Sequence, residues 1–68
     1  MSVAKIVEIK SSSTKSFDDA IKDGLARAGE TIKNIQSAWI NEQEVIVSPM
    51  GEVKEYRVLM KVTFIVQD

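Results

Sequence analysis

The sequence predicts an α+β fold: a strand, a helix and two further strands, forming a three-stranded antiparallel sheet, with the last strand central, packed on one amphipathic helix. Three observations predict it. Alternate positions of residues 55–66 are apolar, an apolar stripe with helical spacing starts at Phe17, and Pro49 and Gly51 lie between two extended runs. At 68 residues without cysteine, the chain is close to the smallest size that one core can stabilise, so we expect a single domain over residues 1–68.

The first strand is expected from Val3 to Lys10, where β-branched residues precede a polar cluster. That cluster, residues 11–15, reads SSSTK and predicts a loop. Two interpretations of the loop stay open. It is a solvated connector, or its hydroxyl groups line a polar pocket or an ion path in an assembly.

The helix is expected to begin at Ser16, because Ser-x-x-Asp ending at Asp19 is a variant of the capping box. Apolar or small residues then recur every three or four positions, until the periodicity changes after Asn34. They are Phe17, Ala20, Ile21, Gly24, Leu25, Ala28, Ile32 and Ile35. Gly24 lies on this stripe, so we expect close packing of the helix on the sheet there.

A second strand is expected after Asn34, because apolar and polar residues alternate. Unbroken alternation predicts one face with Ser37, Trp39, Asn41, Gln43, Val45 and Val47, and another with Ala38, Ile40, Glu42, Glu44 and Ile46. Residues 48–51 predict a hairpin connection longer than two residues. The third strand is expected from about Val53 to Val66, with the side that starts at Tyr56 and ends at Val66 against the helix.

Composition limits the classes of function. Hydrophobic residues make up 44% of the chain, so we expect apolar surface to be shared between subunits of a homo-oligomer. Nine basic and ten acidic residues give a net charge of -1 without a basic stripe, which argues against a nucleic-acid partner. No apolar run approaches the ~20 residues of a membrane span and the N-terminus lacks a secretory signal, so the expected location is cytoplasmic.

Catalysis is not expected. Without histidine or cysteine, no nucleophile and base pair can be assembled, and the scattered glycines form no phosphate loop. Glu42 and Glu44 could form a carboxylate pair, although solvated or interface charge is the preferred interpretation. A metal site would use oxygen ligands, which suit calcium or magnesium, but no dedicated loop spacing is present.

Trp39 is the most informative single residue, because its neighbours in the predicted strand are polar. Two roles stay open for it. It anchors a subunit interface, or it is a stacking platform for a planar ligand.

Three separated segments resemble the dodecin family: KIVEIKSSSTKSFDDAI, LARAGETIKNI and EYRVLMKVTF. The resemblance covers nearly the whole chain. It implies a strand-helix-strand-strand protein that assembles as a hollow homododecamer and stores or sequesters flavin, such as riboflavin or FMN, at subunit interfaces. In flavin-binding dodecins a tryptophan early in the second strand stacks on the flavin, and a glutamine after the aromatic residue of the last strand contacts its edge.

Ser37 and Arg57 stand at the positions of that tryptophan and that glutamine. The chain is thus also similar to the branch without the flavin tryptophan, whose members include calcium dodecins, and a flavin-free protein with a structural or calcium-binding role is the alternative function. Trp39 would project about 7 Å beyond Ser37 on the same face, and Arg57 could stack on a ring or pair with an anionic group. The candidate ligand residues are Ser37, Trp39, Gln43 and Arg57.

Overall fold

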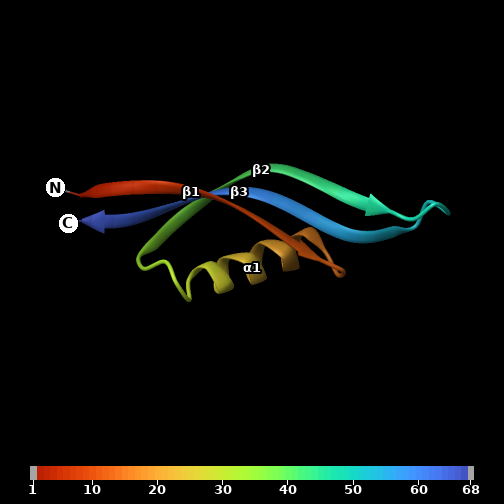
Figure 1. Ribbon diagram of the computed structural model, residues 1–68, viewed down its shortest axis with the longest axis horizontal. Helices are drawn as coiled ribbons and strands as arrows, with labels where there is room; N and C mark the ends of the chain where they lie inside the picture. The colour runs from red at the N-terminus through yellow and green to blue at the C-terminus, as the bar shows by residue number, and fades with distance from the viewer. Residues whose placement is uncertain (1, 68) are drawn as a thin grey trace.

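The computed structural model describes residues 2–67 and confirms the predicted fold class (Figure 1). The elements are β1 (Val3–Ser13), α1 (Phe17–Ala28), β2 (Ile35–Val47) and β3 (Val53–Gln67). They form one sheet in the order β1-β3-β2, in which both neighbouring pairs are antiparallel. Met1 and Asp68 of the predicted domain lie outside the described residues. Among residues 2–67, no helix is long and apolar enough to cross a membrane.

The core lies between β3 and α1. Val58, Met60 and Val62 of β3 and Ala20 of α1 are at most 1% exposed, and α1 packs across β1 and β3. The half-buried residues around this core are Val7, Ile9, Phe17, Ile21, Leu25, Ile35 and Ala38. The predicted helix-facing side of β3 is therefore confirmed, because alternate residues of the central strand share that side.

Gly24 is a point of close approach between α1 and the sheet. A Cβ atom there would lie 2.7 Å from Ser11 Cβ and 3.1 Å from Met60 Cε. Ser11 also donates a hydrogen bond from Oγ to the carbonyl of Ala20 at 2.7 Å. The close packing predicted at Gly24 is confirmed, and it brings the helix backbone within hydrogen-bond reach of a strand side chain.

β1 continues to Ser13, so the predicted loop over residues 11–15 is wrong for the three serines. Ser11 lies opposite Val58 and Ser13 lies opposite Tyr56 in the ladder with β3. Ser13 Oγ donates a hydrogen bond to Asp19 Oδ2 at 2.7 Å. Because α1 supplies partners for the hydroxyl groups, polar residues extend this strand at little cost.

The predicted cap of α1 is confirmed in its first half, since Ser16 Oγ accepts a hydrogen bond from the Asp19 N–H at 2.9 Å. The second half differs from the predicted capping box. The Asp19 carboxylate bonds to Ser13, and the Ser16 N–H donates to Ser13 Oγ at 3.4 Å. Ser13 thus takes the part of the acid at the N3 position of a capping box, and it ties the end of β1 to the start of α1.

α1 ends at Ala28, before the predicted end near Asn34. Gly29 occupies the C-cap, where its N–H donates to the carbonyl of Leu25 at 2.9 Å. Asn34 then adopts a φ of 63°, and its carbonyl accepts a hydrogen bond from the Ile65 N–H at 3.0 Å. Ile32 lies in this connection, where its side chain is half-buried. It therefore continues the helical spacing of apolar residues in the sequence, although the helix has already ended.

The hairpin between β2 and β3 has the predicted long connection. Ser48 accepts hydrogen bonds at Oγ from the N–H groups of Met50 and Glu52, both at 3.2 Å. Gly51 has a φ of 87°, a conformation that glycine adopts without steric cost.

The register of β2 is interrupted at Asn41. Ile40 lies opposite Met60, whereas Glu42 lies opposite Leu59, the next residue of β3. Two steps along β2 therefore match one step along β3, which makes Asn41 the extra residue of a β-bulge.

The bulge exchanges the two faces for the rest of β2, so the faces predicted from unbroken alternation are wrong after Asn41. Glu44 lies opposite Arg57 on the side away from α1, and Gln43 lies opposite Val58 on the side of α1. Glu42 and Glu44 consequently share a face with Trp39, and Gln43 does not.

Candidate functional site

The face of the sheet opposite α1, called the open face here, gathers aromatic, acidic and basic side chains. Trp39 lies across from Lys61, Glu42 from Leu59, and Glu44 from Arg57. On the other side of β3, Lys10 lies across from Leu59 and Ser12 from Arg57. Its central residues are Glu8, Lys10 and Ser12 of β1, Arg57, Leu59 and Lys61 of β3, and Trp39, Glu42 and Glu44 of β2.

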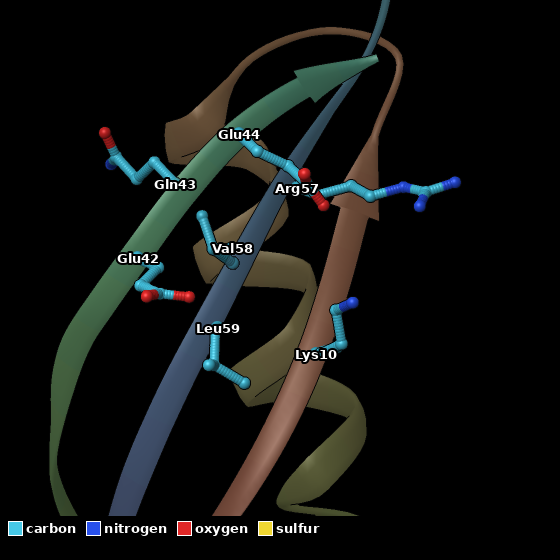
Figure 2. A pocket seen from close by; sticks show the side chains of 7 residues that line it. All are labelled: Lys10, Glu42, Gln43, Glu44, Arg57, Val58 and Leu59. Carbon is cyan, nitrogen blue, oxygen red and sulfur yellow. The ribbon is translucent and has the colours of Figure 1, made fainter.

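A hollow of about 330 Å³ lies over β3 at this face (Figure 2). It is lined by Lys10, Glu42, Gln43, Glu44, Arg57, Val58 and Leu59. Figure 2 shows Glu42 and Glu44 reaching from β2 over the sheet, with Leu59 between Glu42 and Lys10. Acidic groups therefore border the hollow on the β2 side and basic groups border it on the β1 side, around an apolar centre.

Arg57 and Lys10 also line a second hollow. Figure 2 shows the Arg57 side chain extending across β1, away from β2. Its Nε donates to Glu55 Oε1 at 3.1 Å, and the side chain remains 38% exposed. The second hollow, of about 250 Å³, is lined by Lys10, Ser11, Ser12 and Arg57. The charged residues that line the second hollow are all basic, whereas the first hollow is lined by acidic and basic residues.

Trp39 is 60% exposed on the open face. Ser37 lies two residues earlier on the same face, as the sequence predicts, and it is opposite Thr63. An exposed indole ring on a sheet offers a flat apolar surface for a planar ligand or for a neighbouring subunit. Both predicted roles of Trp39 are compatible with this exposure.

The four predicted ligand residues do not converge on one point of the protomer. Arg57 is four residues from Lys61, the partner of Trp39, which places the two rows about 13 Å apart along β3. Gln43 lies on the wrong side of the sheet for the predicted arrangement, because of the bulge. Figure 2 shows its side chain pointing away from the other residues that line the hollow.

Sequence analysis did not single out Lys10 and Ser12 as site residues. Lys10 looks like an ordinary strand charge until its pairing with Leu59 places it beside Arg57. Ser12 falls in the predicted loop, where a polar pocket was one of the two interpretations. The missing signal is the register of β1 on β3, which local residue patterns do not encode.

Comparisons with known proteins agree on one family. The family model described as Dodecin matches residues 3–67. The calcium dodecin of Mycobacterium tuberculosis is 31% identical over 64 residues, which cover 94% of this chain and 89% of that protein.

Solved structures give the same answer. The crystal structure of a Thermus thermophilus dodecin mutant matches with a TM-score of 0.90 and 31% identity, covering 100% of both chains. A dodecin from Streptomyces davaonensis matches with a TM-score of 0.91 and 25% identity, covering 98% of this chain and 97% of that one. The crystal structure of the M. tuberculosis calcium dodecin, described with a novel calcium-binding site, matches with a TM-score of 0.80 and 29% identity. The match covers 91% of this chain and 87% of that one. The chain belongs to the dodecin family.

Proposed function

We propose that this chain assembles into a hollow homododecamer that binds and stores a small planar ligand of the flavin class, riboflavin or FMN, on the open face. The observation that carries the proposal is Trp39, an indole 60% exposed on the face that also holds the charged hollow. Binding is favoured over catalysis because carboxylates, Lys10, Arg57, an amide and aliphatic groups line the hollow, a set without an activated nucleophile.

Self-association is supported by the distribution of apolar surface. The fully buried core holds Ala20, Val58, Met60 and Val62. Many large apolar side chains are exposed: Val3, Ile6, Trp39, Ile40, Val45, Val47, Met50, Val53 and Val66. A core this small gives a single protomer little stability, and contacts between copies would bury the exposed groups.

Trp39 provides the direct test of ligand binding. In a titration of riboflavin or FMN followed by flavin fluorescence, we expect quenching with the wild-type protein. Trp39→Leu, which keeps apolar bulk but removes the ring, should weaken binding about tenfold, because stacking on an indole contributes on the order of 1–3 kcal/mol. Trp39→Phe should retain most of the affinity, because it keeps a stacking ring.

Sedimentation of the same variants separates the two roles of Trp39. A platform predicts that Trp39→Leu keeps the assembly of the wild type and loses flavin. Dissociation of Trp39→Leu into smaller species would identify an interface anchor instead. Absence of fluorescence quenching at micromolar wild-type protein would refute flavin binding.

Calcium binding is the second candidate function, favoured by the placement of Glu42 and Glu44 on one face beside the hollow. The similarity to the M. tuberculosis calcium dodecin supports it. Among residues 2–67, no group of three or more acidic, histidine or cysteine side chains could hold a metal ion. Calcium takes about six to eight oxygen ligands, so two carboxylates would need ligands from a neighbouring copy or from water.

The double substitution Glu42→Gln/Glu44→Gln tests this candidate. It preserves side-chain size and removes both charges, so we expect isothermal titration of calcium to lose its saturable heat. Glu30→Gln/Glu52→Gln removes the same charge from exposed positions outside the hollow and should leave calcium binding unchanged. Equal calcium binding by both double variants would exclude Glu42 and Glu44 as ligands.

A further inference from the structure

We propose that the first hollow, of about 330 Å³ over β3, binds a small zwitterion that has an ammonium group and a carboxylate at opposite ends of a short apolar chain, as in an ω-amino acid. Glu42 would bind the ammonium group, and Lys10 would bind the carboxylate. The inference goes beyond the proposed function, because neither a flavin nor calcium carries an ammonium group.

Opposite charges border this hollow on the two sides of β3. Leu59 lies across from Lys10 of β1 and across from Glu42 of β2, so the three residues form one row of the open face. Neighbouring strands are about 4.8 Å apart, so the backbones of Lys10 and Glu42 are about 10 Å apart. Figure 2 shows Leu59 between these two side chains. A ligand along this row would meet a base at one end, an apolar group in the middle and an acid at the other end.

The next row of the open face repeats the order of charges. Glu44 of β2 lies across from Arg57 of β3, and both line the hollow. Figure 2 shows the Arg57 side chain extending across β1, so its charge lies on the same side as that of Lys10. The two carboxylates of the lining would repel a simple anion, and the two bases would repel a simple cation. A ligand with both signs of charge complements the lining.

The charged groups of the hollow are not paired with one another. In the part of the chain that the structure describes, neither Lys10 nor Glu42 forms an ion pair, although both are exposed. Arg57 donates through Nε to Glu55 at 3.1 Å and leaves Glu44, its neighbour across the strands, unpaired. Glu55 is thus a positioning residue that holds a positive charge away from β2. The carboxylates and the ammonium group can therefore form charge-assisted hydrogen bonds to a ligand.

The width of the row selects the kind of zwitterion. An α-amino acid carries both charges on one carbon atom, which is short for a row that spans two strand spacings. In an ω-amino acid, methylene groups separate the charges, and these groups would cover Leu59 and remove apolar surface from water. δ-Aminovalerate is a suitable probe, because its ammonium group and its carboxylate lie at the two ends of an unbranched chain.

Ligands of matched size test the zwitterion site in calcium-free buffer. Valerate and pentylamine each keep one charge of δ-aminovalerate, and its isomer norvaline carries both charges at one end. Saturation-transfer NMR measures the affinities, since it suits weak ligands of a large protein. At low ionic strength we expect the wild type to bind δ-aminovalerate about tenfold more tightly than any of the other ligands, because hydrogen bonds to charged groups are the stronger ones and salt screens exposed charges.

Single substitutions identify the residue that recognises each charge. Lys10→Gln should bind δ-aminovalerate and pentylamine about equally, because the carboxylate loses its partner. Glu42→Gln should bind δ-aminovalerate and valerate about equally, because the ammonium group loses its partner. Lys5→Gln, on the helix-facing side of β1, and Glu30→Gln, at an exposed position outside the hollow, make the same charge changes and should keep the wild-type preference.

Exchange of the two charges separates recognition of the ligand from a structural role. A zwitterion can bind in either direction, so Lys10→Glu/Glu42→Lys should recover part of the affinity for δ-aminovalerate that Lys10→Glu alone loses. A double variant that binds no better than Lys10→Glu would overturn the site. A wild type that binds δ-aminovalerate no more tightly than norvaline, or not at all, would also overturn it. These measurements use neither flavin nor calcium, so the proposed function and this inference can fail separately.

Discussion

Met60→Ala is expected to destabilise the protein by about 3 kcal/mol per protomer. Met60 is completely buried under α1 in the centre of β3, and its terminal methyl would lie 3.1 Å from a Cβ atom added at Gly24. Truncation of a buried methionine removes transfer free energy and leaves a cavity, at a cost of about 2–5 kcal/mol. Urea unfolding followed by circular dichroism measures the loss, with all variants at one protomer concentration because assembly contributes to stability.

Met50→Ala is the matched control for Met60→Ala. Met50 lies in the hairpin connection and is 87% exposed, so the same change in chemistry removes no buried contact. We expect its free energy of unfolding to stay within about 0.5 kcal/mol of the wild type. A similar loss in both variants would show that Met60 is not the centre of the core.

Gly24→Ala is expected to destabilise by about 2 kcal/mol, although alanine is the better helix former by about 1 kcal/mol. The added methyl would lie 2.7 Å from Ser11 Cβ and 2.8 Å from Ser11 Oγ. Relief of that overlap requires α1 to move away from β1, which weakens the Ser11 to Ala20 hydrogen bond and the packing around it. Thermal or urea unfolding measures whether the free energy of unfolding falls or rises in this variant.

A double-mutant cycle assigns the cost to the contact with Ser11. Ser11→Gly removes both atoms that the new methyl would meet first. In that background, Gly24→Ala should cost less than about 1 kcal/mol, so the two substitutions should couple by more than about 1 kcal/mol. Additive effects, or stabilisation by Gly24→Ala alone, would contradict the close approach.

The central features of the fold could be predicted from the sequence because they depend on short-range periodicity. Alternation from Tyr56 to Val66 identifies the helix-facing side of β3, and the helical stripe through Ala20 and Gly24 identifies the side of α1 that meets it. The cap at Ser16 is equally local, since its partner is three residues away. Each of these predictions agrees with the structure because residues that are close in the sequence determine it.

The errors arise where distant residues decide the structure. Ser11 and Ser13 have the composition of a loop, yet their hydroxyl groups find partners on α1, and β1 continues. Ile32 and Ile35 keep the helical spacing after the helix has ended at Gly29. The partners of the serines lie on another element, which propensity does not include, and the helix ends at the Gly29 cap in spite of the apolar spacing beyond it.

In the candidate site, too, some features could be predicted from the sequence and others depend on residues distant in the chain. Trp39 stands out in the sequence because it is a large aromatic residue among polar ones, and the structure places it exposed on the open face. The neighbourhood of Arg57, by contrast, depends on the registers of two strand pairs. The register of β1 on β3 cannot be read from one strand, so Lys10 and Ser12 are recognised only in the folded chain.

The bulge at Asn41 also changes which positions of β2 face the hollow. Before it, the odd-numbered positions Ser37 and Trp39 belong to the open face, and after it the even-numbered positions Glu42 and Glu44 do. Deletion of Asn41 would remove the bulge but leave Glu42 and Glu44 on the open face, because Ile40 and Glu42 already lie opposite adjacent residues of β3. The charges that a ligand meets therefore depend on the register at this bulge, and variants of residues 42–45 designed by unbroken parity from Trp39 would alter the wrong side of the sheet.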